Sequence, residues 1–175
     1  MQRWRVPLGF ACAAVFFLLA RPTPGTLLIG GIVALPGLAI RAWASGHLRK
    51  NESLAIGGPY AYTRNPLYLG SFLLGLGFTI AAGRWILVII FAAMLLGIYV
   101  PVMRVESQAL AEIFGERYRR YANKVPSFLP RLSPYRDEST TSFDSSLYLR
   151  YREYRAALGT VVAWALLGLK WILFR

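Results

Sequence analysis

The sequence predicts an all-α protein, an integral membrane helical bundle of about five transmembrane helices with an amphipathic helix on the cytoplasmic side. Hydrophobic residues make up 56% of the 175 residues, and the mean hydropathy is +0.45. The formal net charge is nevertheless +12. This combination is rare in soluble domains and typical of membrane proteins whose cytoplasmic loops are rich in Lys and Arg.

Five apolar runs carry the predicted membrane spans, at residues 6–20, 27–40, 67–82, 85–103 and 156–169. Several are shorter than the roughly 20 residues that a free-standing span requires. Flanking Trp, Tyr and Arg side chains extend them into the interface. We therefore expect four core spans and a fifth near the C-terminus. Arg3 and Arg5 precede the first run without a convincing signal-peptide cleavage site, so this run is expected to remain as a helix.

The basic residues predict the orientation of the bundle. The loop at 41–64 and the segment at 104–155 hold most of them, whereas the turns between these segments carry only Arg21 and Arg84. Under the positive-inside rule the N-terminus and both basic segments lie in the cytoplasm and the C-terminus lies outside. We assign the charge of +12 to this topology and to contact with anionic membrane lipids, since the sequence contains no nucleic-acid-binding motif.

Asn65 and Pro66 predict the start of a helix at the membrane surface. Asn is a favoured N-cap that accepts hydrogen bonds from the first amides, and Pro suits the first helical position. The free N–H groups and the positive end of the helix dipole, with Arg64 beside them, favour a carboxylate or phosphate. Aromatic rings nearby could wall a flat base or face a cation. These are Tyr60, Tyr62 and Tyr68.

The segment 103–125 predicts the amphipathic helix. Its apolar stripe consists of Met103, Leu110, Phe114, Tyr118, Tyr121 and Val125, with Glu116, Arg119, Arg120 and Asn123 opposite. Glu106 lies near the edge of this stripe, where an acid is costly without a partner. Arg104 lies on another face, so we expect that partner to come from another element or from a ligand ammonium group.

The order and spacing of several short motifs resemble one family. The motifs are Gly58-Pro59-Tyr60, then Arg64-Asn65-Pro66-Leu67-Tyr68-Leu69-Gly70, then Glu106, Leu110, Phe114-Gly115, Tyr118, Tyr121, Val125-Pro126 and Pro130. Over about residues 27–132 they resemble the isoprenylcysteine carboxyl methyltransferase family and its phospholipid N-methyltransferase relatives. The resemblance implies a small multi-span enzyme that binds S-adenosylmethionine on the cytoplasmic side and receives its methyl acceptor from the bilayer.

The resemblance also implies roles for individual residues. The cofactor candidates are Gly58, Tyr60, Tyr62, Arg64, Asn65, Pro66, Tyr68, Leu69, Glu106 and His47, with Glu106 holding the amino group or ribose. The position of His47 in a basic loop indicates a solvated surface residue more than a catalytic base. The catalytic candidates are Glu106 and Arg104, the latter to hold an anionic acceptor or, equally, to snorkel to the interface. The sequence differs from the family pattern at Asn65, where the family has His, and at Ser107, where it has a second Glu.

The cofactor's own chemistry agrees with these roles. S-adenosylmethionine needs a site for an anion, a site for a cation and an aromatic or apolar middle. The helix start with Arg64, the Glu106 carboxylate and the tyrosines provide these in turn. Methyl transfer to a carboxylate, thiolate or free amine requires little acid–base chemistry, so orientation and exclusion of water can supply most of the rate.

The domain organisation follows from the same patterns. Residues 1–132 form the predicted membrane core, 133–146 a linker rich in Ser, Thr, Asp and Pro, and 147–175 an additional C-terminal interfacial or transmembrane helix. We expect one continuous helix from about Ser146. It packs beside the core, closes over the pocket or mediates a homodimer, and the sequence does not choose among these.

The leading hypothesis for function is methyl transfer from S-adenosylmethionine to a lipophilic membrane acceptor. A prenylcysteine carboxylate, a phospholipid amine or another small lipophile all remain open. The alternatives are a non-catalytic membrane protein that binds lipid or a partner, and a nicotinamide-dependent membrane reductase. Since His47 is the only histidine and Cys12 the only cysteine, neither a metal site nor a disulfide framework is expected.

Overall fold

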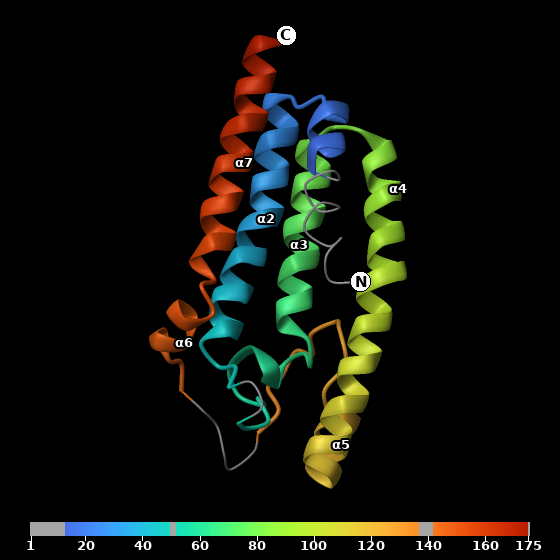
Figure 1. The fold of residues 1–175 in the computed structure, drawn as a ribbon, viewed down its shortest axis with the longest axis vertical. Coiled ribbons are helices and arrows are strands. Elements are labelled where there is room, and N and C mark those ends of the chain that lie inside the picture. Colours follow the sequence, from blue (N-terminus) through green and yellow to red (C-terminus); the bar gives the residue numbers. More distant parts are fainter. Residues whose placement is uncertain (1–12, 50–51, 137–141, 175) are drawn as a thin grey trace.

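The computed structural model describes residues 13–49, 52–136 and 142–174, and its long helices run side by side along one axis (Figure 1). Residues 13–19 are helical. The elements that follow are α2 (Pro24–Ser45), the 3₁₀ turn η2 (Gly58–Ala61), α3 (Pro66–Ala81), α4 (Trp85–Met94), the π-helical turn η3 (Leu95–Tyr99), α5 (Val100–Lys124), α6 (Ser145–Arg150) and α7 (Tyr154–Leu173). The described residues contain no strand, so the all-α prediction is confirmed.

Three helices are long and apolar enough to cross a membrane: Pro24–Ser45, Trp85–Lys124 and Tyr154–Leu173. A fourth, α3, is apolar but has only 16 residues. The first predicted run, at 6–20, lies partly outside the described residues. The count of five spans therefore stays a prediction.

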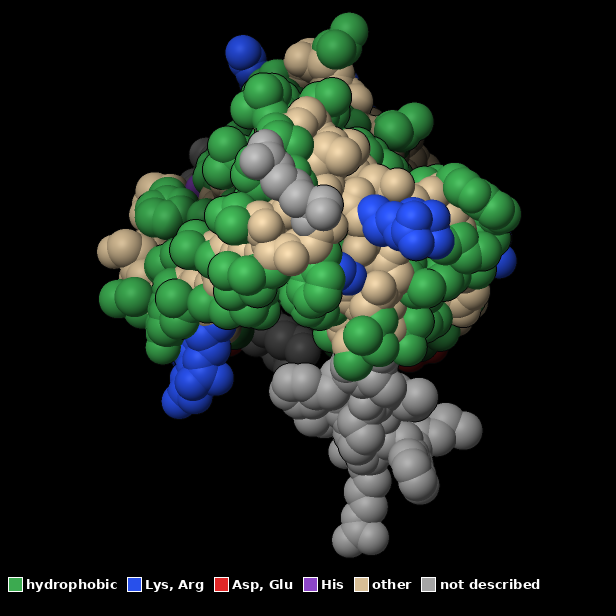
Figure 2. All heavy atoms as spheres, turned by 90° about the horizontal axis from the view of Figure 1, so that it is seen from above, with side chains coloured by type: hydrophobic (Ala, Val, Ile, Leu, Met, Phe, Trp, Pro, Cys, Tyr) green, Lys and Arg blue, Asp and Glu red, His purple; other side chains and the backbone are tan. Residues whose placement is uncertain are grey.

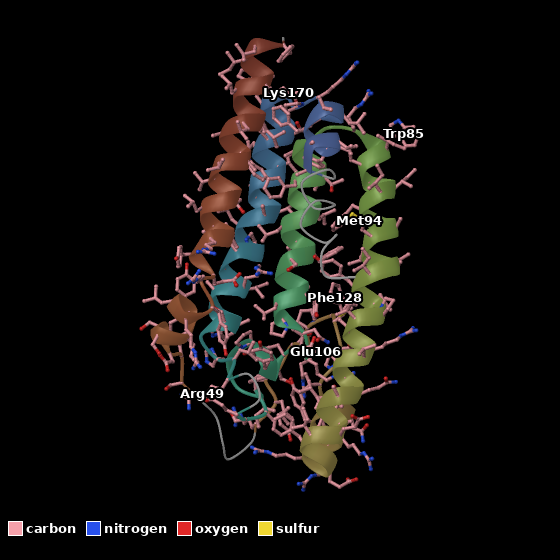
Figure 3. The ribbon with its side chains drawn as sticks, viewed as in Figure 1. Arg49, Trp85, Met94, Glu106, Phe128 and Lys170 are labelled. Carbon is pink, nitrogen blue, oxygen red and sulfur yellow. The ribbon has the colours of Figure 1, made fainter. Side chains whose placement is uncertain are left out.

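Apolar side chains cover the outside of these helices. Leu28 is 67% exposed, Val161 is 65% exposed and Trp85, which points outward from the start of α4, is 73% exposed (Figure 3). Figure 2 shows hydrophobic side chains dominating the end of the bundle, with few Lys or Arg. Soluble monomers rarely expose so much contiguous apolar surface. The protein is an integral membrane protein, and its outer surface is suited to lipid.

The α2 and α3 helices are in close contact through small residues. A Cβ atom added to Gly30 would lie 2.4 Å from the Gly77 carbonyl oxygen, and one added to Gly37 would lie 2.7 Å from the Gly70 carbonyl oxygen. Only glycine allows the two backbones to approach so closely. This rigid pair fixes the C-terminal end of α2 against the N-terminal end of α3.

The amphipathic helix is α5, and it continues from α4 through η3. The chain is helical from Trp85 to Lys124, with non-helical backbone angles at Gly115 (φ 51°, ψ −130°). The buried members of its predicted apolar stripe are Met103, Tyr118, Tyr121 and, just after the helix, Val125. The predicted stripe is therefore confirmed at these positions.

The prediction of one continuous C-terminal helix from about Ser146 is wrong. The α6 helix begins at Ser145 because Asp144 caps it, accepting from the Ser146 amide at 2.9 Å. It ends at Arg150, and α7 begins only at Tyr154. Arg152 between them has φ 54°, which breaks the helical path. The predicted linker at 133–146 lies partly outside the described residues.

The α7 helix packs beside α2 as an added member of the bundle. A Cβ atom added to Gly31 would lie 3.8 Å from the Trp164 ring. The centroids of the Trp164 and Phe78 rings are 4.9 Å apart. Leu167 is 2% exposed. At the far end the Lys170 ammonium group donates to the carbonyl of Leu18 at 3.0 Å. Of the three roles left open by the sequence, packing beside the core is the one observed, and a homodimer stays a prediction.

The two basic segments meet at one end of the bundle. The Arg64 amide donates to the Pro126 carbonyl at 2.9 Å, and the Arg131 amide donates to the Tyr62 carbonyl at 2.9 Å. Arg49 and Glu106 lie at this end in Figure 3, whereas Trp85 and Lys170 lie at the opposite end. The chain thus brings the Gly-Pro-Tyr loop, the start of α3 and the α5 helix together.

Candidate functional site

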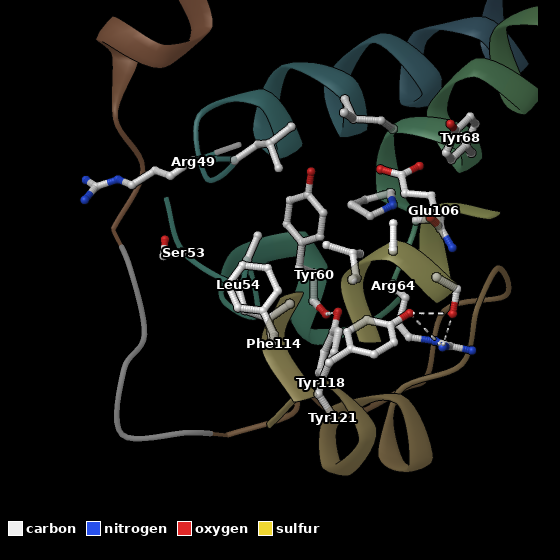
Figure 4. A pocket seen from close by; sticks show the side chains of 18 of the residues that line it. Arg49, Ser53, Leu54, Tyr60, Arg64, Tyr68, Glu106, Phe114, Tyr118 and Tyr121 are labelled. Carbon is white, nitrogen blue, oxygen red and sulfur yellow. Dashed lines mark hydrogen bonds between the residues drawn. The ribbon is translucent and has the colours of Figure 1, made fainter. Parts of the chain in front are cut away.

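A cavity of about 570 Å³ lies where these segments meet. Its walls come from the C-terminal end of α2, the loop before η2, the first turn of α3 and the middle of α5 (Figure 4). The volume is within the 300–1,000 Å³ usual for small-molecule sites. Apolar side chains of Leu54, Leu110 and Phe114 share the walls with a few polar groups.

The first turn of α3 lies at the wall of this cavity. The amides of Leu67 and Tyr68 have no acceptor within the helix, and both residues line the cavity. The prediction that the Asn65 side chain caps the helix is wrong. Its Nδ2 instead donates to the carbonyl of Ser127 at 2.9 Å and to that residue's Oγ at 3.2 Å. Asn65 therefore holds the loop that follows α5, and its side chain does not cap the first backbone amides of α3.

Arg64 brings a positive charge to the same place. Its Nη1 donates to the Tyr118 hydroxyl at 3.2 Å and to Ser107 Oγ at 3.5 Å, and these two oxygens are 2.7 Å apart (Figure 4). Its Nε is buried and has no hydrogen-bond partner among the described residues. Both of these partners are hydroxyl groups, and among the described residues no carboxylate forms a salt bridge with this guanidinium. The region is suited to an anionic group.

Glu106 supplies the opposite charge. Its side chain lines the cavity, as does that of Tyr68, and the two lie near one another in Figure 4. The Tyr68 ring lies edge-on to the Tyr99 ring, with centroids 5.6 Å apart. Since Tyr99 is in the π-helical turn, this turn helps to set the position of Tyr68. A carboxylate here can bind an ammonium group or a ribose hydroxyl.

Phenol rings form the middle of the site. Tyr60 is 6% exposed, and the Tyr121 hydroxyl holds its backbone by donating to the Tyr60 carbonyl at 2.7 Å. Burial raises the pKa of Tyr60 far above its ordinary value, and the nearby Tyr121 and Glu106 raise it further. Tyr60 is therefore a neutral ring at physiological pH, and the electron-rich face of such a ring can contact a cation.

The structure places five of the predicted cofactor residues at the cavity wall together with Glu106. The five are Tyr60, Arg64, Asn65, Pro66 and Tyr68. Tyr62 packs on Trp43, Leu69 is buried in α3, and His47 lies against Gly58. None of these four residues lines the cavity. Arg104 is exposed on α5 and also lies outside the cavity wall.

His47 differs from its predicted surface position. It is 6% exposed, and its Nδ1 donates to the Trp43 carbonyl at 3.0 Å. Its ring lies against Phe143 with centroids 5.9 Å apart and fills the space where a Gly58 side chain would be. The prediction of a solvated residue is wrong because the α2 helix continues to Ser45 and its C-cap turns the histidine inward. His47 supports the Gly-Pro-Tyr loop from behind.

Sequence reasoning missed several polar residues of the cavity wall, and Arg41 and Ser71 are two of them. Arg41 and Ser71 line the cavity, and Arg41 Nη1 donates to Ser71 Oγ at 2.5 Å. The same guanidinium forms a salt bridge with Glu153 at 2.5 Å. The sequence pattern places Arg41 in a basic loop because the apolar run ends at Ile40. The Ala-Trp-Ala sequence that follows Arg41 is the signal that could have put this residue in the helix, because it continues the helix by one turn.

The described residues contain no group of three or more His, Cys, Asp or Glu side chains placed to hold a metal ion.

Comparison with known proteins assigns the chain to a class that agrees with this fold and site. Residues 27–117, which include the start of α3 and Glu106, match the phospholipid methyltransferase family. The chain belongs to this family of membrane methyltransferases.

Three relatives are similar over much of the chain. It is 35% identical to the cobalt-zinc-cadmium resistance protein CzcN of Cupriavidus metallidurans, over 84% of this chain and 71% of the relative. It is 39% identical to the nickel-cobalt-cadmium resistance protein NccN of Alcaligenes xylosoxydans xylosoxydans, over 57% of this chain and 47% of the relative. It is 33% identical to the protein-S-isoprenylcysteine O-methyltransferase of Schizosaccharomyces pombe, over 70% of this chain and 48% of the relative. The chain thus spans about half the length of the last two, and no solved structure matches it.

Proposed function

We propose that this protein transfers a methyl group from S-adenosylmethionine to a lipophilic acceptor within the membrane. One observation carries the proposal: a single cavity, lined mostly by residues of the family-matched segment, contains an arginine at a helix N-terminus, a carboxylate and buried phenol rings. The similarity to an isoprenylcysteine O-methyltransferase supports the same chemistry.

The residues of the cavity fit the cofactor. The buried, unpartnered Nε of Arg64 and the free amides of Leu67 and Tyr68 match the amino acid carboxylate of S-adenosylmethionine. Glu106 matches its ammonium group or a ribose hydroxyl, as the family resemblance implies. The neutral phenol of Tyr60 suits the sulfonium and the adenine ring. When bound, this cofactor supplies an activated methyl group that an acceptor with a lone pair displaces from sulfur.

The residues of this chain then have two tasks. Arg64 and Glu106 orient the bound molecule by binding its carboxylate and its ammonium group, which lowers the entropic cost of the reaction. The apolar residues Leu54, Leu110 and Phe114 exclude water, which would otherwise weaken those electrostatic contacts. No general base is required if the acceptor arrives as a carboxylate, a thiolate or a free amine.

The setting we propose is the cytoplasmic side of the membrane. The cavity lies at the end of the bundle that carries the basic segments, and the positive-inside rule directs that end to the cytoplasm. A water-soluble cofactor would reach the cavity from there. The lipophilic acceptor would reach it from the bilayer around the helices.

Transfer of a labelled methyl group tests this proposal. Membranes that contain the protein are incubated with S-adenosylmethionine tritiated on the methyl group, and an organic extract is counted. We expect incorporation with the wild type and a loss with Arg64→Gln. The control is Arg120→Gln, which changes an exposed arginine near the C-terminal end of α5 and should keep the wild-type level. Equal incorporation with and without the protein would contradict the proposal.

A further inference from the structure

A second hollow lies between α2 and the corner where α6 joins α7. It has a volume of about 220 Å³ and is lined by Leu38, Ala39, Ala42, Tyr148, Glu153 and Ala157. We call it the α2–α7 groove. Most of its wall is made of small or apolar side chains. The polar side chains of Tyr148 and Glu153 lie at its α6–α7 corner, where they can contact the polar head of an amphiphile.

The groove and the main cavity share one wall. Arg41 lines the main cavity and Glu153 lines the groove, and their side chains form a salt bridge at 2.5 Å. Their side chains are only 23% and 11% exposed. Arg41 Nη1 also donates to Ser71 Oγ, which lies on the main-cavity side. A molecule in the groove is therefore separated from the main cavity by one pair of side chains.

The break between α6 and α7 creates this arrangement. Arg152 adopts φ 54°, a left-handed conformation that is strained for a residue with a side chain. The resulting turn places Glu153 against α2. Ala39, Ala42 and Ala157 have side chains too small to fill the space between the two helices, so the groove stays open.

The surroundings of the groove indicate what enters it. Leu35, one turn before Ala39 on α2, is 65% exposed, and Leu158, next to Ala157 on α7, is 61% exposed. Both flank the groove with apolar surface that faces lipid. A water-soluble molecule has no favourable path across that surface, whereas an apolar chain from the bilayer does.

We propose that the α2–α7 groove is the lateral entry and tail-binding site for the lipophilic methyl acceptor. The apolar chain lies along the three alanines, and the polar head passes the Arg41–Glu153 pair to reach the main cavity. This inference rests on the proposed methyltransferase function. It assigns acceptor binding to α6 and α7, which lie beyond the family-matched residues 27–117.

Photo-crosslinking in nanodiscs tests the groove. The probe is a palmitate analogue with a diazirine in the middle of its chain, and labelled fragments are identified by mass spectrometry. We expect labelling of fragments that contain 38–42 and 154–158, competed by unlabelled palmitate. Ala157→Trp, which fills the groove, reduces this labelling to background.

Two further variants make the result decisive. Ala39→Trp fills the groove from the exposed side of α2, so it also blocks labelling if Ala157→Trp fails to fold. Ala165→Trp adds the same bulk to an exposed position of α7 outside the groove, and keeps wild-type labelling. Labelling that persists in the groove variants, that falls equally in Ala165→Trp, or that maps to α4 would overturn the proposal.

Calorimetry with S-adenosylmethionine separates this inference from the proposed function. We expect the groove variants to bind the cofactor as the wild type does, because their side chains lie outside the main cavity. If the wild type is labelled in the groove but binds no S-adenosylmethionine, the methyltransferase function fails while the groove remains a lipid site.

Discussion

Gly58→Ala tests how the Gly-Pro-Tyr loop is held in place. Gly58 has φ 56°, and an added Cβ atom would lie 2.6 Å from the Cδ2 and Nε2 atoms of His47. The imidazole has little room to withdraw, because it is 6% exposed, lies against the Phe143 ring and is hydrogen-bonded to the Trp43 carbonyl. The substitution therefore adds both backbone strain and a steric clash.

The expected loss of stability is the sum of two costs. A side chain in the left-handed region costs about 1–2 kcal/mol, and overpacking a filled site costs about 1–3 kcal/mol. The total of about 2–5 kcal/mol is a large part of a typical folding free energy of about 5–15 kcal/mol. Because Tyr60 lies two residues after Gly58, a shift of this loop away from His47 should also weaken cofactor binding.

A double-mutant cycle with His47→Ala separates the two costs. Unfolding in mixed micelles is followed by Trp fluorescence as the denaturing detergent is increased. In the His47→Ala background the clash is absent, so Gly58→Ala should cost only the backbone strain, with a coupling energy of about 1–3 kcal/mol. An equal cost of Gly58→Ala in both backgrounds would refute the reasoning.

Three further comparisons between variants test the packing and burial of the bundle. Gly77→Ala places a Cβ atom 2.6 Å from a carbonyl oxygen of α2 and should destabilise by about 1–3 kcal/mol, whereas Gly159→Ala, with nothing within 4 Å, should stabilise by about 0.5–1 kcal/mol in the same detergent titration. Tyr121→Phe leaves the buried Tyr60 carbonyl without its 2.7 Å donor and should cost about 1–3 kcal/mol, against no measurable loss for the exposed Tyr154→Phe. Because burial raises the pKa of Tyr60 in the folded state, the stability that this group contributes is present below about pH 10 and is lost as the pH rises further. A titration of stability from neutral to alkaline pH should therefore decline less steeply in Tyr60→Phe, and identical slopes would contradict the burial of this phenol.

The helical architecture could be predicted from the sequence because apolar runs and helix-start residues act locally. Pro66 at the first position of α3 and the apolar stripe of α5 were both correctly predicted for the same reason. The break at Arg152 could not be, since a left-handed residue other than glycine has no local signature and is held by tertiary contacts such as the Arg41–Glu153 salt bridge.

The candidate site was predictable in part. The residues near the start of α3 and Glu106 do line one cavity, and a motif with fixed spacing identified them. Asn65 was assigned to the wrong hydrogen bonds because its partner, Ser127, is 62 residues away. Arg41 was missed for a similar reason, as its partners Ser71 and Glu153 come from other helices. Contacts of this kind depend on the assembled bundle.

The most direct measurement is calorimetric titration of the purified protein in detergent. S-adenosylmethionine and S-adenosylhomocysteine are titrated separately, with a nicotinamide dinucleotide as the control ligand. The variants are Glu106→Ala and, as a match on the same helix, the exposed Glu112→Ala.

The proposed site predicts micromolar binding of both sulfur ligands to the wild type and to Glu112→Ala, and its loss in Glu106→Ala. Absence of binding to folded wild-type protein would contradict the cofactor assignment and favour a non-catalytic membrane role. Binding of the nicotinamide dinucleotide in their place would favour a membrane reductase.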